Sequence, residues 1–515
     1  MRLGELVARA AARTPEKTAI IFQHHRITYS QLNEGVNRVA NGLATLGVKK
    51  GDRVALYMHN LPQFIEAFYG AQVLGATVIP MNVMYKAGEI EYILNDGGVK
   101  AILTLAPFYP NVQAIRDKVR SLEHAIVLSN DPLPGAILWH AAFANQPREA
   151  TPAAGDDQDV AVILYTSGTT GKPKGAMLTH HNLIANIEQL DQLDRLKIND
   201  NDSVWIGLPL FHIYALSVGV NSAIYHGATL DLMERFDPTA SLEMFQRDKP
   251  TIVLAAPPMY ISWVINPNVT TFDLSSIRVA SSGASAIPVA ILEKFHKLTG
   301  VEILEGYGLT ETAPVATTNA AGPVTKPGSI GPAIPQMEIR IVDDNDQEVP
   351  VGEVGELVCR GPNVMKGYFN KPEANEEAFR NGWFHTGDLA KVDEDGYYYI
   401  VDRKKDMILV SGFNVYPREV EEVLYKHPKI ADAAVVQSPD EYQGESVMAF
   451  VVLKQGETAT EKEIIEYCRS EIAVFKCPRR VEFRAELPKN MTGKVLRREL
   501  RDEAARMAAE RKQGG

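Results

Sequence analysis

The stretch 165–175, which reads YTSGTTGKPKG, constrains the fold more than any other part of the chain. It follows an uncharged apolar run at 160–164 that is typical of a buried strand. Its small and hydroxylated residues leave backbone N–H groups and hydroxyls to surround an anion, and Lys172 and Lys174 add positive charge. We interpret the stretch as a phosphate-binding loop after a strand, against the simpler reading of a surface turn. It is not a Walker A loop, because only two residues separate its first two glycines and proline follows its first lysine.

Length and composition restrict the class of protein. At 515 residues the chain exceeds one ordinary domain, so we expect two or more. A formal net charge of -11 argues against nucleic acid as the main partner. The three cysteines form no CxxC pair, so neither a disulfide framework nor a zinc site is indicated. The start is acidic at Glu5, and no apolar run approaches the ~20 residues of a membrane span, so we expect a cytoplasmic protein.

The first 150 residues alternate between helical and strand patterns. Such alternation predicts a parallel sheet with helices on its faces. We find no cluster there that suggests catalysis, and the segment 150–159 is predicted to be a linker. The expected helices are 32–46, 62–74 and 89–95, and the expected strands are 51–57, 75–80 and 99–103.

Histidines after the loop have ordinary structural explanations from their local sequence. His180 and His181 are adjacent, so they do not share a helix face, and we interpret them as the start of a helix rather than as metal ligands. His212 lies in the apolar run 208–216, where a packed core histidine is the usual finding. Further on, we expect a buried strand at 253–258, a strand and small-residue turn at 279–288, and a helix at 289–298.

The stretch 301–312 is the second informative one, because a strand ending in Gly-Tyr-Gly is followed by a hydroxyl and a carboxylate. In open α/β sheets, ligands bind beyond the carboxyl ends of strands. Thr310 could bond a phosphate, and Glu311 could hold Mg²⁺, which prefers hard oxygen ligands shared with phosphates. Together with the lysine-bearing loop, this stretch suggests a nucleotide–Mg²⁺ site.

The pattern changes after about residue 330. Alternating runs at 339–343 and 355–359 predict antiparallel strands. Asp388 follows a glycine, where it could accept ribose hydroxyls or simply be a solvated turn residue. The charge cluster 402–406 predicts a boundary between domains 1–402 and 403–515. Beyond it we expect a turn at 410–417, helices at 418–427, 461–472 and 498–512, and strands at 430–437 and 447–453.

Five motifs in this order resemble the adenylate-forming superfamily of acyl-CoA synthetases, luciferases and peptide-synthetase adenylation domains. They are 165–175, 306–311, 382–389, 402–417 and 488–494. The chain looks most like bacterial long- or medium-chain fatty acid–CoA ligases. The resemblance implies an α/β fold: a large N-terminal domain of mostly parallel sheets covered by helices, with a β-barrel-like subdomain, and a small mobile α+β C-terminal domain. It also implies ATP, Mg²⁺ and coenzyme A, an acyl-AMP intermediate and release of pyrophosphate.

The same resemblance implies roles for individual residues. Lys494 would reach the substrate carboxylate and α-phosphate, His212 would lie beside the reacting carboxylate, and Gly412 would border the coenzyme A channel after rotation about the hinge Lys405. Thr166 and Glu311 would bind the metal ion. The nucleotide would be bound by Thr166, Ser167, Gly168, Thr169, Thr170, Gly171, Lys172, Lys174, Ser282, Gly283, Ala284, Glu305, Gly306, Tyr307, Gly308, Thr310, Asp388, Ile400 and Arg403. The acyl pocket would comprise His212, Tyr214, Ala215, Val218, Tyr260, Ala313, Pro314 and Val315.

The expected acyl pocket, with a strand and loops at 212–219, is apolar and suits an alkyl chain. No carboxylate for an amino-acid substrate and no arginine for a dicarboxylate occurs in 208–220. An aryl or short-chain acid, a carrier-protein-loading enzyme and a non-catalytic descendant stay open as alternatives. Peripheral membrane contact and a homodimer stay open as well.

Overall fold

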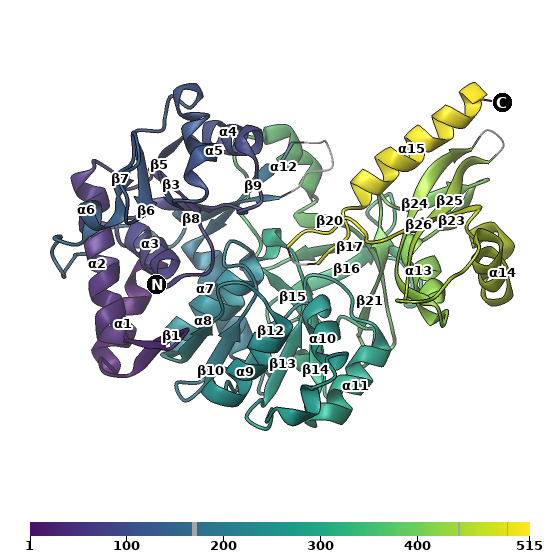
Figure 1. Ribbon diagram of the computed structural model, residues 1–515, viewed down its shortest axis with the longest axis horizontal. Helices are drawn as coiled ribbons and strands as arrows, with labels where there is room; N and C mark the ends of the chain where they lie inside the picture. The colour runs from purple at the N-terminus through teal and green to yellow at the C-terminus, as the bar shows by residue number, and fades with distance from the viewer. Residues whose placement is uncertain (167–171, 441–442, 492, 515) are drawn as a thin grey trace. The chain divides into compact units, whose positions relative to one another are not determined.

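The structure is a computed structural model that describes residues 1–166, 172–440, 443–491 and 493–514 (Figure 1). It divides into two compact units. Unit 1 comprises Met1–Glu338 and Cys359–Phe384, and unit 2 comprises Ile339–Val358 and His385–Gly515. The chain crosses from one unit to the other inside three of its strands. This division differs from the predicted domain boundary at residue 402, which stays a prediction.

The first sheet of unit 1 contains the strand that precedes the phosphate loop. Six of its strands are parallel, while β9 runs antiparallel to β8 and β18 antiparallel to β9. The order is β18 (Gly367–Tyr368), β9 (Lys174–Thr179), β8 (Val160–Thr166), β4 (Thr77–Pro80), β3 (Arg53–Tyr57), β5 (Val99–Leu105), β6 (His124–Leu128) and β7 (Ile137–Leu138). The central strands are buried on both faces, as parallel sheets covered by helices require.

The second sheet of unit 1 contains the strand that ends in Gly-Tyr-Gly. Its six inner strands are parallel, and an antiparallel strand closes each edge. The order is β15 (Val315–Thr318), β14 (Ile303–Gly308), β13 (Val279–Ser282), β12 (Ile252–Ala255), β10 (Ser203–Ile206), β11 (Thr229–Leu232), β1 (Thr18–Phe22) and β2 (His25–Thr28).

Helices of unit 1 begin where the sequence provides caps. Thr28 and Thr179 each accept a hydrogen bond in a capping box, and proline occupies the first helical position of the helices that begin at Pro62, Pro238 and Pro257. Neighbouring helices α9, α10 and α11 lie side by side (Figure 1). The helices are α1 (Leu6–Arg13), α2 (Tyr29–Thr45), α3 (Pro62–Val73), α4 (Ala87–Asp96), α5 (Tyr109–Gln113), α6 (Trp139–Phe143), α7 (His180–Leu190), α8 (Ser222–His226), α9 (Pro238–Asp248), α10 (Pro257–Val264), α11 (Val289–Thr299) and α12 (Pro372–Ala378).

The two histidines after the loop begin a helix, as predicted. His180 is the first residue of α7, and its Nδ1 accepts a hydrogen bond from the backbone N–H of Leu3 at 3.2 Å. Burial lowers the pKa of His180 to about 4, so this ring is neutral and packed.

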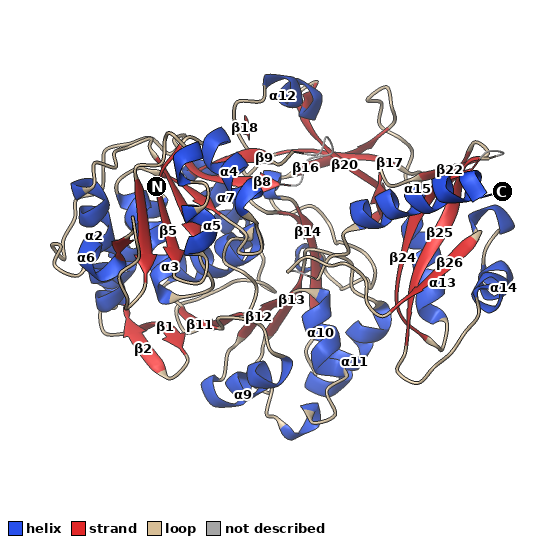
Figure 2. Cartoon of the chain, turned by 45° about the horizontal axis from the view of Figure 1, so that its top comes forward, coloured by secondary structure: helices blue, strands red, loops and turns tan. Residues whose placement is uncertain are grey.

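A five-stranded sheet contains the strands expected after residue 330. It has the order β16 (Glu338–Val342), β17 (Gly355–Arg360), β20 (Trp383–Val392) and β19 (Phe379–Arg380), and β21 (Tyr398–Arg403) pairs with β20. The strands are drawn in red in Figure 2.

The remaining sheet of unit 2 has helices on both faces. Its order is β23 (Phe413–Val415), β22 (Ile408–Val410), β25 (Gly444–Leu453) and β24 (Ile430–Asp440), with β26 (Arg480–Arg484) beside β25. Val435 and Ala449 pack with residues of α13 (Pro417–Lys426) and α14 (Glu461–Glu471). Alternate residues such as Phe450 pack with α15 (Arg497–Gly514), so one sheet supports two apolar cores.

Three local predictions were wrong. The expected strand 253–258 ends at Ala255, because Pro257 begins α10 with a backbone φ suited to a first helical turn. The expected turn 410–417 contains strand β23 of a short hairpin. The expected pocket strand and loops at 212–219 are instead mostly a π-helix, η3 (Tyr214–Asn221), because a short apolar run does not distinguish strand from helix.

Candidate active site

The described ends of the phosphate loop are anchored in unit 1. Tyr165 Oη donates a 2.8 Å hydrogen bond to Asp96 Oδ2, and Lys371 Nζ pairs with Asp96 Oδ1 at 2.5 Å. Lys172 Nζ lies 5.6 Å from the centre of the Tyr92 ring. Residues Ser167, Gly168, Thr169, Thr170 and Gly171 lie outside the described part of the chain, so their predicted contacts with phosphate stay predictions.

Glu311 joins the two motifs that were predicted to meet. Its Oε1 accepts hydrogen bonds from Tyr368 Oη at 2.9 Å and from Thr166 Oγ1 at 3.4 Å. Lys174 Nζ lies 5.2 Å from the centre of the Tyr368 ring. The first and second sheets of unit 1 thus bring a carboxylate, two hydroxyls and a lysine together around one point.

Asp96 and Tyr368 were missed by the sequence reasoning. Asp96 is the last residue of α4, and Tyr368 lies on the two-residue strand β18. Neither stands in a motif with a chemical signature, and both reach the loop from distant parts of the chain. Only the pairing of β18 with β9 identifies Tyr368 as a neighbour of the loop.

The residues predicted to surround adenine lie on adjacent parallel strands. Ser282 ends β13 and is opposite Glu305 of β14. The Ser282 hydroxyl is buried and forms no hydrogen bond with the described residues, so it is a polar group that a ligand could satisfy. Ala284 has a left-handed φ of 72°, which turns the chain sharply after β13.

The end of β14 requires glycine for a steric reason. A Cβ atom on Gly308 would lie 1.9 Å from the carbonyl oxygen of Pro314, and one on Gly306 would lie 3.2 Å from that of Thr317. The chain after β14 therefore packs backbone against backbone on β15. Tyr307 lies between these two glycines on β14, and Thr310 begins the short helical turn after the strand.

The residues predicted to form the acyl pocket gather around the π-helix η3. Tyr214 Oη donates a hydrogen bond to Ser281 Oγ at 3.0 Å, and a Cβ on Gly283 would lie 3.3 Å from the Tyr214 ring. Tyr260 Oη donates to the Ser281 carbonyl at 2.9 Å. Tyr214 is therefore shared between the predicted acyl pocket and the predicted adenine site.

Other members of the predicted pocket follow the same helix. Ala215 and Val218 are buried on η3, and His212 is half-buried just before it. Ser217 Oγ of the same helix donates to the Ala313 carbonyl at 3.0 Å, which places the segment 313–315 beside η3. The π-helix thus connects His212 with Ala313, Pro314 and Val315.

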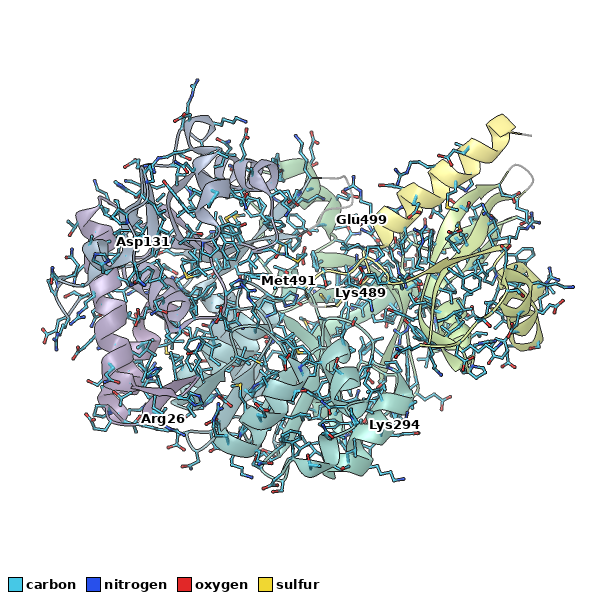
Figure 3. The ribbon with its side chains drawn as sticks, viewed as in Figure 1. Arg26, Asp131, Lys294, Lys489, Met491 and Glu499 are labelled. Carbon is cyan, nitrogen blue, oxygen red and sulfur yellow. The ribbon has the colours of Figure 1, made fainter. Side chains whose placement is uncertain are left out.

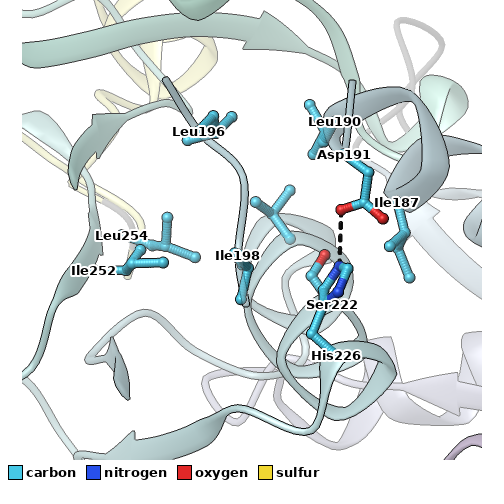
Figure 4. A pocket seen from close by; sticks show the side chains of 10 residues that line it. Ile187, Leu190, Asp191, Leu196, Ile198, Ser222, His226, Ile252 and Leu254 are labelled. Carbon is cyan, nitrogen blue, oxygen red and sulfur yellow. Dashed lines mark ion pairs between the residues drawn. The ribbon is translucent and has the colours of Figure 1, made fainter. Parts of the chain in front are cut away.

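A small apolar cavity lies behind η3 (Figure 4). His226 Nε2 pairs with Asp191 Oδ1 at 2.8 Å in its wall. The cavity has a volume of about 10 Å³, which is room for about one water molecule. In this conformation it is too small for an alkyl chain. Its lining comprises Ile187, Leu190, Asp191, Leu196, Ile198, Val218, Ser222, His226, Ile252 and Leu254.

The remaining predicted residues belong to unit 2. Asp388 and Arg403 face each other on β20 and β21, with Arg403 Nε 3.7 Å from Asp388 Oδ1. Ile400 lies on β21, and its carbonyl accepts from Arg418 Nη1 at 2.9 Å. Lys494 is half-buried near both Asp388 and Arg403, whose charges affect its pKa. Two of the three groups predicted to meet around the sugar and α-phosphate are thus paired, and the third is close by.

Gly412 and Lys405 occupy turns of unit 2. Gly412 has φ +86° and follows Ser411 at φ 51°, a pair typical of the tight turn between β22 and β23. This backbone conformation explains the glycine without reference to coenzyme A. Lys405 lies in the turn after β21, where burial lowers its pKa.

Comparison with known proteins identifies the family. The chain matches the family described as AMP-binding enzyme over residues 7–369 and the AMP-binding enzyme C-terminal domain over residues 419–494. It is 39% identical to the long-chain-fatty-acid–CoA ligase of Bacillus subtilis, covering 97% of this chain and 94% of that one. It is 38% identical to the protein of the same name from Escherichia coli O6:H1, covering 98% and 94%.

A solved structure gives the same result for the fold. The crystal structure of an anthranilate CoA ligase in complex with anthranoyl-AMP superposes with a TM-score of 0.92 at 30% identity, covering 99% of this chain and 98% of that one. The chain belongs to the family of AMP-binding enzymes, which confirms the predicted superfamily and the predicted α/β fold with its separate C-terminal domain. The roles of the individual site residues stay predictions.

Among the described residues, no helix is both long enough and apolar enough to cross a membrane.

Proposed function

We propose that this chain is an ATP-dependent acid–CoA ligase that activates a fatty acid. As an AMP-forming acid–thiol ligase, it joins a substrate carboxylate oxygen to the α-phosphorus of ATP, and the bond to pyrophosphate breaks. The sulfur of coenzyme A then attacks the acyl carbonyl carbon, and the bond to AMP breaks. The contact of Glu311 with Thr166 and Tyr368 carries the proposal, because it joins the strand-end motif to the phosphate loop.

The residues around Glu311 fit a magnesium ion that is bound together with nucleotide phosphates. No group of three or more His, Cys, Asp or Glu side chains suited to a metal occurs among the described residues. One carboxylate beside a hydroxyl suits Mg²⁺, which keeps most of its shell as water and phosphate oxygens. The ion would neutralise phosphate charge, while Glu311 and Thr166 would fix its position and Lys172 and Lys174 would bind phosphate.

The positive charge for the first step is assigned to Lys494. Reactions of this kind depend on positioning and charge neutralisation rather than on a protein nucleophile. Arg403 and Asp388 hold the ribose in this assignment, and both act electrostatically on Lys494 within unit 2. His212 binds the carboxylate end of the acid, and Gly412 serves the second step.

A fatty acid is favoured as the substrate by two observations. The relatives from Bacillus subtilis and Escherichia coli are both named for long-chain fatty acids. Tyr214, Ala215 and Val218 present a buried apolar surface with no charged side chain in the surrounding segment 208–220. An aryl acid is the second candidate, because the structure of an anthranilate CoA ligase superposes closely and the Tyr214 ring offers a flat surface.

The test is a panel of carboxylic acids assayed for AMP release with and without coenzyme A. The proposal expects release with saturated fatty acids, which increases when coenzyme A is present and yields the thioester. Release with benzoate-type acids alone would favour the aryl candidate. Release that never depends on coenzyme A would favour a carrier-loading enzyme, and no release with any acid would remove the ligase function.

A further inference from the structure

Arg497 connects three elements of unit 2 through buried carboxylates. Its Nη2 lies 2.5 Å from Glu421 Oε2 on α13, and its Nη1 lies 3.4 Å from Asp402 Oδ1 on β21. Arg497 itself is the first residue of α15. Glu421 and Asp402 are 8% and 6% exposed, so the two carboxylates would be costly to bury without this cation.

Backbone donors satisfy the other carboxylate oxygens and fix the pair. Glu421 Oε1 accepts from the N–H of Val435 at 2.8 Å, and Asp402 Oδ2 accepts from that of Arg418 at 2.8 Å. The guanidinium group of Arg497 thus meets two acceptors that cannot move without breaking hydrogen bonds to secondary structure. Its guanidinium group is therefore held by α13 and β21 as well as by α15.

Lys494 lies three residues before Arg497, on a closed turn. The backbone N–H of Lys494 donates to Asn490 Oδ1 at 2.9 Å, and its carbonyl accepts from the Asn490 N–H at 2.9 Å. The Leu496 N–H donates to the Pro488 carbonyl at 2.8 Å. Lys489 and Met491 of this turn and Glu499 of α15 are labelled in Figure 3. A side chain anchored at 497 therefore fixes a turn that is already internally bonded.

Several charged groups act on the Lys494 ammonium. Burial, the Arg403 guanidinium and the Arg497 guanidinium lower the pKa of Lys494, Asp388 and Asp406 oppose them, and the pKa that results is about 8. Asp406 is itself paired with Arg501 at 3.2 Å. An ammonium that loses its proton near this pH would stop supplying positive charge in alkaline solution.

We propose that Arg497 is a positioning residue for adenylation: held by Glu421 and Asp402, it fixes the Lys494 turn, and its charge sets the alkaline limit of the first half-reaction. The inference rests on the proposed function, in which Lys494 assists adenylation. A purely structural ion pair would affect stability and rate, but would leave the pH dependence of the half-reaction unchanged.

The experiment measures fatty-acid-dependent pyrophosphate release from ATP without coenzyme A, from about pH 6 to about pH 10. Burial raises the pKa of Glu421 to about 7, so only the decline above about pH 8 is assigned to Lys494. Arg497→Gln should lower the rate about tenfold and move the alkaline decline upward by about half a pH unit, because one positive neighbour of Lys494 is gone. Glu421→Gln keeps the arginine charge but removes one anchor, so it should lower the rate without an upward shift of the decline.

Arg484→Gln is the matched control. Arg484 of β26 also forms an ion pair with α15, through Glu503, but its charge is not one of those with the largest effect on Lys494. This variant should keep the wild-type rate and pH profile. Thermal melting and the transfer of supplied acyl-AMP to coenzyme A, expected to persist in every variant, establish that each is folded.

Different outcomes test the positioning role of Arg497 and the proposed role of Lys494. An Arg497→Gln profile that declines at the wild-type pH would overturn the inference, even if the rate fell. If Arg497→Gln does not fold, Glu421→Gln decides. The inference is overturned if the alkaline decline of Glu421→Gln moves upward, or if this variant has the same rate and pH profile as the wild type. Lys494→Ala should abolish pyrophosphate release and retain acyl transfer, and undiminished release in that variant would instead refute the role of Lys494 in the proposed function.

Discussion

At the residue scale, Asp231 is the side chain whose surroundings differ most from what its chemistry prefers. It lies in the middle of β11 with 0% exposure, and neither carboxyl oxygen forms a hydrogen bond with the described residues. Burial, supported by the charge of Asp248 and opposed by Arg247 and Arg26, raises the pKa of Asp231 from 3.8 to about 8. The folded protein therefore holds this carboxyl in its neutral form at pH 7.

Replacing Asp231 should change how stability depends on pH. Between about pH 4 and about pH 8 the folded carboxyl keeps a proton that the unfolded one releases, so the stability of the wild type decreases as pH rises through this window. Asp231→Asn removes that decrease. In thermal melting, we expect its midpoint relative to wild type to be on the order of 5 °C higher at pH 9 than at pH 5.

Asp202, directly before β10 of the same sheet, provides a control of opposite sign. Arg278 pairs with it at 2.6 Å, and the pKa of Asp202 is lowered, so its contribution is lost in acid rather than in base. Asp202→Asn should therefore destabilise mainly above its ordinary pKa. Parallel pH curves for both variants and the wild type would contradict both assignments.

Glu311 gives a second prediction at this scale. Glu311→Gln removes the carboxylate charge proposed to hold Mg²⁺, so AMP formation should fall at least about tenfold and require more Mg²⁺. Tyr368→Phe removes only a donor to that carboxylate and should change the rate by a smaller factor. Titrating pyrophosphate release against Mg²⁺ measures both, and an unchanged Mg²⁺ requirement in Glu311→Gln would reject the metal role.

At the scale of elements, the hairpin of β14 and β15 is held by close backbone packing. Its backbone approach at Gly308 leaves no room for a side chain, and Asn363 Nδ2 donates to the carbonyls of Thr312 and Val315 at 2.7 and 3.0 Å. The predicted nucleotide motif and the predicted acyl segment are thus two sides of one rigid turn.

Gly308→Ala should disrupt this turn. The added Cβ meets a carbonyl oxygen rather than a flexible side chain, so the backbone must shift. We expect a lower melting temperature and a loss of adenylation of about tenfold or more. Gly88→Ala in α4 is the control, because nothing lies within 4 Å of its Cβ and alanine favours a helix. Equal behaviour of the two variants would show that the close approach does not matter.

Elements with a regular pattern could be predicted from sequence, and those set by tertiary contacts could not. The pattern of α3 and the start of α7 at His180 depend on local sequence, so both were predicted. The π-helix η3 lies in a uniformly apolar run whose conformation is decided by packing, such as the Ser217 contact with Ala313. The motif around Glu311 was found, but its partner Tyr368 was not, since only β-sheet pairing brings it there.

At the scale of the whole molecule, we propose that Lys405 is a hinge whose rotation separates the two half-reactions. Among the described residues, the backbone N–H of Lys405 donates no recorded hydrogen bond, whereas those of Asp406 and Met407 both donate to Arg403. Proline at 405 would therefore remove no bond of this turn but would fix its φ. Lys405→Pro is expected to keep adenylation within about threefold and to slow acyl transfer to coenzyme A at least about tenfold.

Single-turnover measurements of each half-reaction test this prediction. Lys404 is unsuitable as a control because it pairs with Asp344 and Glu356. Lys405→Ala, which removes the side chain but keeps a free φ, is the matched variant and should retain both steps. Equal slowing of both half-reactions by proline would place the hinge elsewhere.

The division of the chain into interleaved units also has a consequence for biosynthesis. Residues 339–358 of unit 2 leave the ribosome before residues 359–384, which complete unit 1. During translation, this first portion of unit 2 must therefore wait for partners that are still unsynthesised, and its strands β16 and β17 have exposed edges in the meantime. Until β20 has been synthesised and has paired with β17, an unpaired strand edge of this kind favours aggregation of the nascent chain.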